Sequence, residues 1–473
     1  MHESLECSLA GTQPYRRLAL DSMAFEEHEG VTRVWHRAVK HSPEPVIPRD
    51  KPWEGWGPYL YGTVMWDEGR LRMWYQCIGC EKGAKQRVCY AESSDGIYWK
   101  KPELGIYENE AGPNNIVDEN RCHIPSVIRL PNPESPDRAY AMYGYAGDAG
   151  ASVSYSPDGL RWRFEDDPKH QRLFSSSDVL NFFYDPYKDR FVCTWKTHNR
   201  HHRAVGVVFS EDGLEWTKPI DGPVFGADDL DPDATQVYGM PVFPYQGCYI
   251  GLPWIYHARI YKYGPYTAKR MYEAQEGSPC TVDVQMAWSW DLISWNRTPR
   301  REPFISLSQD GGLDSGQLYT ARAPVIVGDK LFFYYGGFNK LHDDVKGTRG
   351  AIFVATLRLD GFCSFTAGDQ EGTVIGRREL FRTPRVTVNA RCEHDGYVAA
   401  EIVDRWNKVI PGFSRRECNV FRGDSVSQEL VWKTAVFPDE LVLPDKKVRF
   451  ILRNAELYSY LPADVEESVE VES

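Results

Sequence analysis

A seven-residue turn motif, Ser-x-Asp-Gly-x-x-Trp, recurs along this 473-residue chain and constrains its fold more than any other feature. The copies are SSDGIYW at 93–99, SPDGLRW at 156–162, SEDGLEW at 210–216 and SWDLISW at 289–295, with a weaker fifth copy, LRLDGFCSF, around Asp360. The aspartates are 54 to 79 residues apart, which suits blades that carry loops and is too irregular for a solenoid. The sequence therefore predicts a closed array of repeated sheets.

The chemistry of the motif indicates a structural role. Each copy lies between two strand-like runs, as in the run RVCYAES before the first copy, so each is predicted to be a hairpin turn. Aspartate accepts hydrogen bonds from turn amides, glycine adopts the positive φ that such turns need, and tryptophan fills the space between sheets. We therefore interpret these aspartates as scaffold and look elsewhere for chemistry.

A further hairpin precedes each turn and supplies two more strands per repeat. These hairpins are YGTVMWDEGRLRMWYQC, VIRLPNPESPDRAYAMYGY, LNFFYDPYKDRFVCTWK, GMPVFPYQGCYIGLPW and APVIVGDKLFFYYGG. Four strands in each of five repeats, with almost no helical periodicity, predict an all-β, five-bladed β-propeller.

The pattern changes after about residue 370. RVTVNARCEHDGYVAAEIVD, SVSQELVWK and KKVRFILRNAELYSYLP are typical of strands but include no further copy of the turn. We predict a propeller over 1–370, with an N-terminal extension over 1–50, followed over 371–473 by a small antiparallel β-sandwich and an acidic tail.

Charge and cysteine content exclude several classes of partner. The formal net charge is −12 without a long basic block, so nucleic acid is not expected. No stretch of 18 uninterrupted apolar residues and no export signal are visible, so neither a membrane span nor secretion is expected. Eleven scattered cysteines, with one C-x-x-C at Cys77 and Cys80, are typical of reduced thiols, and we predict a cytoplasmic protein.

Several segments resemble the five-bladed propeller glycosidase superfamily, which contains glycoside hydrolase families 32, 43 and 68, and in particular bacterial proteins similar to the family 32 N-terminal domain. The matching segments are KPWE at 51–54, GRLRMWY at 69–75, SDVLNFFYDP at 177–186, LDSGQLY at 313–319 and FYYGGFNKLH at 333–342. The resemblance implies that the protein cleaves or transfers a glycosidic bond of a carbohydrate substrate. The site would lie at one end of the propeller axis, where the inner strands begin.

Cleavage of an acetal needs two carboxyl groups in different protonation states. The resemblance implies three catalytic candidates: Glu54 before the first inner strand, Asp178 in the third repeat and Asp314 in the fifth. Other residues near the strand starts are expected to bind substrate, and the abundance of aromatic residues suits a sugar cleft: Trp56, Asp118, His123, Asp233, Gln236, Tyr238, Gln317, Tyr319, Arg322 and His342.

Each carboxylate also has a structural interpretation. Glu54 is placed to cap a turn or pair with an arginine on the rim, Asp178 to form an Asx turn, and Asp314 to shape a glycine-rich turn. The chain also departs from family 32, because Val179 follows Asp178 where the family has proline and no Glu-Cys pair stands at the position of the general acid. The individual acid and base roles stay open.

The cluster HNRHH at 198–202 raises the question of a metal site. It is predicted to be a hairpin tip, where His201 and His202 point to opposite sides and do not share an ion. We expect no metal and no cofactor.

Two other functions stay open besides a glycosidase. A phosphorylase resembling family 130 would use phosphate in place of one carboxylate, held by basic residues such as Arg121, Arg322 and His342. A non-catalytic carbohydrate-binding propeller is the alternative from another class, because a fold does not by itself supply a reaction.

Overall fold

The computed structural model describes residues 9–78, 86–108, 112–119, 122–147, 150–199, 202–232, 234–258, 280–309, 311–342, 344, 346–379, 381, 385–433 and 445–462. The chain divides into two compact units. The first comprises Met1–Ala10 and Ala38–Thr356, and the second comprises Gly11–Arg37 and Leu357–Ser473.

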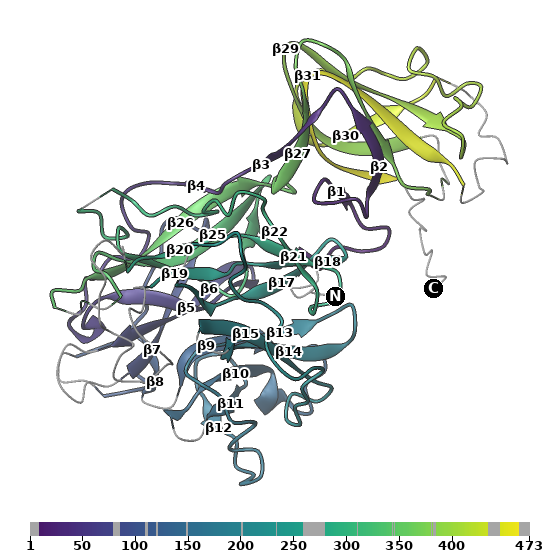
Figure 1. Ribbon diagram of the computed structural model, residues 1–473. Helices are drawn as coiled ribbons and strands as arrows, with labels where there is room; N and C mark the ends of the chain where they lie inside the picture. Colours follow the sequence, from purple (N-terminus) through teal and green to yellow (C-terminus); the bar gives the residue numbers. More distant parts are fainter. Residues whose placement is uncertain are drawn as a thin grey trace. The chain divides into compact units, whose positions relative to one another are not determined.

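The first three repeats of the first unit form three antiparallel sheets, each with its strands in chain order (Figure 1). The first sheet contains β5 (Pro58–Asp67), β6 (Arg70–Ile78), β7 (Gln86–Ser93) and β8 (Ile116–Glu119). The second contains β9 (His123–Arg129), β10 (Tyr140–Tyr145), β11 (Ala151–Ser156) and β12 (Arg163–Phe164). The third contains β13 (Leu180–Asp185), β14 (Arg190–Asn199) and β15 (His202–Ser210). The hairpins expected in this part of the chain are therefore present.

The fourth and fifth repeats pair less regularly than expected. One sheet contains β17 (Val242–Tyr245), β18 (Cys248–Gly251), β21 (Ala287–Ser289) and β22 (Trp295–Arg297). An eight-stranded sheet contains β16 (Thr235–Gly239), β19 (Trp254–His257), β20 (Val282–Val284), β23 (Gln317–Thr320), β24 (Val325–Val327), β25 (Lys330–Phe338), β26 (Gly350–Arg358) and β4 (Val39–Lys40).

Proline explains why the predicted hairpin around residues 239–254 is divided between these two sheets. Pro241 lies between β16 and β17, and Pro253 lies between β18 and β19. Because proline has no amide hydrogen, it interrupts the ladder of each strand. The two repeats therefore do not form two separate four-stranded sheets, and the count of five blades stays a prediction.

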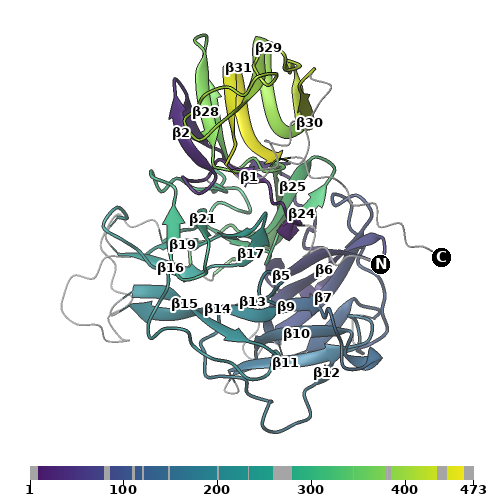
Figure 2. The ribbon, with the colours of Figure 1, turned by 90° about the vertical axis from the view of Figure 1, so that its right-hand side faces the viewer.

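Hydrogen bonds between successive repeats close the first unit into a ring, and Figure 2 shows the inner strands β5, β9 and β13 close together. Each link joins one repeat to the next along the chain, and the last returns to the first repeat. The donors and acceptors are Val127 N to Thr63 Oγ1, Phe182 N to Ser126 Oγ, Thr194 Oγ1 to Met240 O, Trp254 Nε1 to Thr320 Oγ1, and Arg322 N to Gly62 O. A ring of sheets around a central axis is the defining feature of a propeller.

Four of the five predicted turn motifs have the expected hydrogen bonds. In the first, Asp95 Oδ1 accepts the amides of Ile97 and Tyr98 at 2.9 Å, and Trp99 Nε1 donates to the carbonyl of Gly96 at 3.1 Å. The aspartates Asp158, Asp212 and Asp291 accept the equivalent amides. These aspartates are therefore committed to their turns.

The fifth predicted copy is wrong. Asp360 belongs to the second unit, and its Oδ2 atom accepts a hydrogen bond from Ser459 Oγ at 2.6 Å within that unit. The positive φ of 58° occurs at Asp360 itself, and not at the following glycine as in the first three copies. The turn therefore has a different geometry although its sequence is similar.

The motif tryptophans pack against the neighbouring sheet, as the sequence predicted. The Trp99 ring lies 5.4 Å from that of Tyr334, Trp216 lies 6.1 Å from Tyr143, and Trp295 lies 6.2 Å from Phe225, all in edge-on contact. These contacts bury large apolar areas between sheets, which is the main source of stability in such an array.

The second unit is assembled from both ends of the chain. Its strands are β1 (Arg17–Leu18), β2 (Phe25–Glu29), β3 (Thr32–Trp35), β27 (Cys363–Ala367), β28 (Gly372–Gly376), β29 (Arg385–Val403), β30 (Asp424–Val431) and β31 (Lys447–Pro462). Residues 11–37 were expected to extend the propeller, but β2 pairs with β28 and β3 pairs with β27. Pairing joins all eight strands into one sheet, and a two-layer sandwich stays a prediction.

Strands account for nearly all the regular structure. Among the elements that lie wholly within the described ranges, the helical ones are the single-turn 3₁₀ helices η1 (Pro52–Glu54) and η2 (Pro136–Arg138), and no described helix is long and apolar enough to cross a bilayer. The predicted class, an all-β propeller, is confirmed.

Candidate functional site

Residues of the inner strands β5, β9, β16 and β23 surround a cavity of about 190 Å³, and β9 and β23 contribute their first residues to it. Six residues predicted to bind substrate line it: Trp56, His123, Tyr238, Gln317, Tyr319 and His342. Tyr59, Tyr61 and Phe338 complete an aromatic wall that the sequence analysis did not include. We call this space the axial cavity.

The rings of the axial cavity support one another. The Tyr319 ring lies 4.8 Å from Tyr61 and 5.5 Å from Tyr238, and the Tyr238 ring lies 5.1 Å from His342. Gln317 accepts the Tyr319 hydroxyl at 2.7 Å and donates to the Lys340 carbonyl at 2.8 Å. Gln317 therefore holds Tyr319 in place, and the wall is rigid and largely apolar.

Two buried polar atoms of the axial cavity lack hydrogen-bond partners within the described part of the chain. They are the Tyr59 hydroxyl and the Nδ1 atom of His123. Burial lowers the pKa of His123 to about 4, although the nearby charge of Asp178 partly opposes this shift. The imidazole is therefore neutral at pH 7. Because burying an unsatisfied polar group is costly, both atoms are suited to a polar ligand such as a sugar hydroxyl.

Asp178 lies beside the axial cavity and not among the side chains that line it. It lies two residues before the start of β13, has a side chain that is 44% exposed, and forms an ion pair with Lys196 of β14. Burial by itself would raise the pKa of Asp178, but the charge and hydrogen bond of Lys196 outweigh it and hold that pKa below its ordinary value. Asp178 is therefore ionised at neutral pH.

Two cations flank the ring of Tyr238. Lys196 Nζ lies 4.6 Å from the ring centroid, and the Arg203 guanidinium lies 5.6 Å from it. Arg203 also donates to Oε1 of the predicted residue Gln236 at 3.0 Å. Neither cation was predicted, because no motif marks them and their proximity depends on the pairing of β14 with β15. In the sequence, the only indication of Lys196 and Arg203 was the alternation of side chains between the two faces of these two strands.

Glu54 does not line the axial cavity. Its side chain is fully buried and accepts hydrogen bonds from Lys101 Nζ at 2.5 Å, the amides of Asp50 and Lys51 at 2.9 and 3.0 Å, and the Tyr75 hydroxyl at 3.2 Å. The two backbone amides correspond to the structural alternative in which Glu54 caps a turn. The charged partner is not the expected arginine on the rim but a lysine 47 residues away, and the pair is buried.

Replacing Glu54 with glutamine should separate the two roles. The amide keeps the shape but removes the charge that faces the buried Lys101, so we expect the free energy of unfolding to fall by about 2 kcal/mol. Urea denaturation measures this change, and the exposed Glu44→Gln variant is the control. If turnover fell by roughly a thousandfold while stability was unchanged, Glu54 would be catalytic after all.

Asp314 is also outside the axial cavity. Its side chain is buried, forms an ion pair with Lys40 Nζ at 2.6 Å, and accepts the Tyr335 hydroxyl at 3.0 Å. The carboxylate therefore joins β4 to the β25 side of the same sheet, which is a structural role.

The remaining predicted residues do not join the axial cavity. Asp118 is buried and accepts the Cys122 amide at 3.1 Å. Arg322 is buried, and Asp233 lies outside the described residues. Of the described carboxylates, Asp344 lines the axial cavity on its exposed side, 3.7 Å from Lys340 Nζ, while Asp178 stands beside it. Of the three predicted catalytic carboxylates, Glu54 and Asp314 form buried ion pairs with lysines, and Asp178 forms a partly exposed one beside the axial cavity.

The histidine cluster forms the predicted hairpin. β14 ends at Asn199 and β15 begins at His202, and these residues are paired in register. His201 lies outside the described residues. Among the side chains that the structure describes, no group of three His, Cys, Asp or Glu is arranged to hold a metal ion.

Comparison with known proteins finds similarity among solved structures. One, named a glycoside hydrolase, is 15% identical with a TM-score of 0.44, over 67% of this chain and 92% of its own. Another belongs to a report on family 130 mannoside phosphorylases and the glycoside hydrolases among them that target β-1,2-mannosidic linkages in Candida mannan. It is 16% identical with a TM-score of 0.45, over 72% of this chain and 96% of its own. A family 32 β-fructofuranosidase from Bombyx mori is 12% identical with a TM-score of 0.41, and the match covers 89% of this chain and 94% of the Bombyx mori chain.

Comparisons by sequence do not extend this result. No family model matches the chain, and no curated protein matches it. The propeller class follows from the ring that the repeats of this chain form. Any activity depends on the residues of the axial cavity.

Proposed function

We propose that the protein is a carbohydrate-active enzyme that binds a sugar in the axial cavity and acts on its glycosidic bond, with Asp178 as the reacting carboxylate. The observation that carries the proposal is the convergence of an aromatic wall, two unpartnered polar atoms and an ionised carboxylate at the starts of the inner strands. Flat apolar rings suit the faces of a sugar, and His123 and Tyr59 suit its hydroxyl groups.

The protonation state of Asp178 limits the role that we assign to it. Because Lys196 keeps the carboxylate ionised, Asp178 is suited to act as a nucleophile, as a base, or as an acceptor for substrate hydroxyls. It is poorly suited to donate the proton that a leaving group needs. We assign Glu54 and Asp314 to the scaffold, on the basis of their burial and their internal ion pairs.

A specific observation favours phosphorolysis as the second candidate. One carboxylate stands beside the axial cavity together with Lys196 and Arg203, and His342 lines the cavity. In phosphorolysis a phosphate oxygen forms the new bond to the anomeric carbon while the glycosidic bond breaks, so phosphate takes the place of one carboxylate. Lys196 and Arg203 supply the positive charge for that anion and replace the expected Arg322, which is buried elsewhere.

A glycan-library screen with product analysis, carried out with and without inorganic phosphate, tests these proposals together. We expect at least one glycan to be cleaved, because the cavity offers both a sugar-binding wall and an ionised carboxylate. Release of free sugar without phosphate identifies a hydrolase, and phosphate-dependent release of a sugar 1-phosphate identifies a phosphorylase. Saturable binding of a glycan without any product would instead support a non-catalytic binding propeller and would contradict the enzymatic proposal.

A further inference from the structure

A second cavity, of about 300 Å³, lies at the opposite end of the β9 strand from the axial cavity. β9 begins at His123, which lines the axial cavity, and ends at Arg129, next to Leu130 of the second cavity. At about 3.3 Å per residue the two cavities are separated by roughly 20 Å. The second cavity is therefore a distinct space on the side of the turn motifs, and it is large enough for a small molecule.

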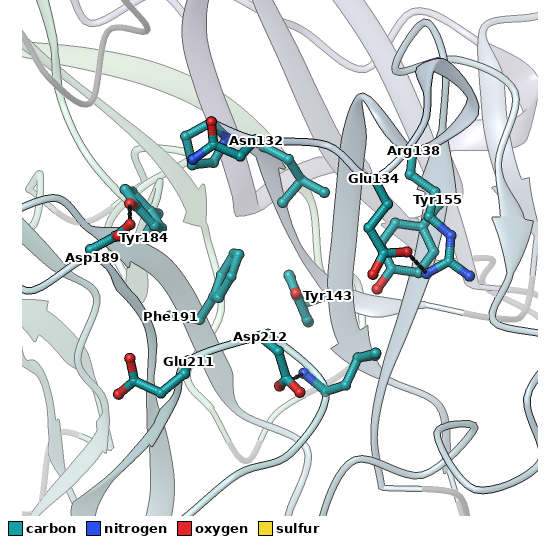
Figure 3. A pocket seen from close by; sticks show the side chains of 13 residues that line it. Asn132, Glu134, Arg138, Tyr143, Tyr155, Tyr184, Asp189, Phe191, Glu211 and Asp212 are labelled. Carbon is teal, nitrogen blue, oxygen red and sulfur yellow. Dashed lines mark hydrogen bonds and ion pairs between the residues drawn. The ribbon is translucent and has the colours of Figure 1, made fainter.

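The floor of the second cavity is aromatic. Figure 3 shows Phe191 and Tyr143 between the side chains on its two sides. Their ring centroids are 6.1 Å apart, and Tyr155 forms part of one side. Tyr143 is only 1% exposed as a residue, and it belongs to the lining of the second cavity. A hydroxyl held by so deeply buried a side chain on the lining of a cavity is placed to hydrogen-bond to a polar ligand.

The rim of the second cavity is acidic. Four carboxylates line it, those of Glu134, Asp189, Glu211 and Asp212, against the single guanidinium of Arg138. Figure 3 shows these carboxylates on several sides of the floor.

The positive charge of Arg138 is already engaged. Its guanidinium lies 3.6 Å from Glu134, 3.2 Å from Glu165 behind it, and 4.2 Å from the centroid of the Tyr155 ring. The field within the second cavity is therefore negative.

We propose that this second cavity binds a small organic cation that carries a primary ammonium group. An aromatic floor attracts a cation through its π face, and carboxylates around it accept charge-assisted hydrogen bonds from the ammonium group. A neutral sugar would use the aromatic floor but would gain nothing from the surplus of negative charge. The inference concerns a site separate from the axial cavity and does not depend on the proposed function.

Titration calorimetry of the full chain with cadaverine, and with the neutral isostere 1,5-pentanediol, tests the proposal. We expect saturable binding of cadaverine at one site and none of pentanediol. The double variant Glu134→Gln, Glu211→Gln should weaken binding roughly tenfold, because both carboxylates are exposed and their loss leaves the floor intact. Tyr143→Phe should weaken it by about threefold through loss of the hydroxyl, and the exposed Glu103→Gln should have no effect.

Two results would overturn the proposal. One is equal binding of cadaverine and pentanediol, which would mean that charge is not recognised. The other is cadaverine binding that is absent, or that the double variant leaves unchanged, which would place any cation site elsewhere. Melting temperatures of the variants show whether each is folded.

Discussion

Replacing Asp178 with asparagine is expected to lower the turnover of a responsive glycan by roughly a thousandfold while leaving the protein folded. Asparagine keeps the size of the side chain but cannot serve as a nucleophile or base. The side chain is 44% exposed, so we expect the protein to stay folded although Lys196 loses its counter-charge. The measurement is kcat on the glycan found by the library screen, together with the melting temperature of each variant.

The exposed Asp221→Asn variant is a matched control and should keep full activity. Full activity in Asp178→Asn would contradict the assignment of Asp178. The pH profile gives a second check on the same residue. If ionised Asp178 is the reacting form, activity is present at neutral pH and is lost as pH falls through its folded pKa, which lies below 3.8. An acid role would require the opposite, a loss of activity as pH rises through that pKa.

The lowered pKa of Asp178 also makes the stability of the folded protein depend on pH. Asp178 has a folded pKa below its unfolded value, so its ion pair with Lys196 stabilises the folded state above the unfolded pKa, and this contribution is lost as pH falls through the folded pKa. His123 adds to the acid sensitivity. The unfolded chain binds a proton at this histidine below about pH 6.5, whereas the folded protein binds it only near pH 4. The free energy of unfolding therefore falls as the pH is lowered from about 6.5 to about 4.

Asp67→Asn is expected to have the largest effect on stability, about 4 kcal/mol in the free energy of unfolding. Asp67 Oδ2 accepts hydrogen bonds from Arg72 Nη1 and the Tyr140 hydroxyl, both at 2.6 Å, and its Oδ1 accepts one from Arg129 at 2.7 Å. The side chains of Asp67 and Arg72 are 1% and 2% exposed. Asparagine would leave the buried guanidinium of Arg72 without its counter-charge.

The effect extends beyond one sheet because Arg72 also donates to the carbonyl of Asp158, in the turn motif of the second sheet, at 2.5 Å. Urea denaturation measures the loss. Glu68→Gln is the matched control, since Glu68 is adjacent and exposed and, among the described residues, pairs only with the exposed Arg70. It should change stability by less than about 0.5 kcal/mol. A loss below about 1 kcal/mol in Asp67→Asn would show that the network contributes little.

The structure brings several of the residues predicted for the axial site to the axial cavity, and it pairs the carboxylates of others with lysines far along the chain. His123, Tyr238 and Tyr319 line the axial cavity because strand starts converge there. Glu54 also lies just before an inner strand, but η1 directs its carboxylate towards Lys101. Nothing in the segment PWEGW predicts a contact with that lysine. Asp314 was directed in the same way towards Lys40.

The sequence by itself determined the all-β class, the hairpins of the first three sheets and the chemistry of the turns. These depend on contacts within a few residues, such as the bonds that Asp95 accepts from the amides of Ile97 and Tyr98. Only the tertiary structure decided how the fourth and fifth repeats share their strands and how residues 11–37 pair in the second unit. It also decided which carboxylate stands beside the axial cavity, because Lys196 and Arg203 reach that place only through the pairing of β14 with β15. Such contacts join residues that are distant in the sequence, so the pattern of residues within one segment does not predict them.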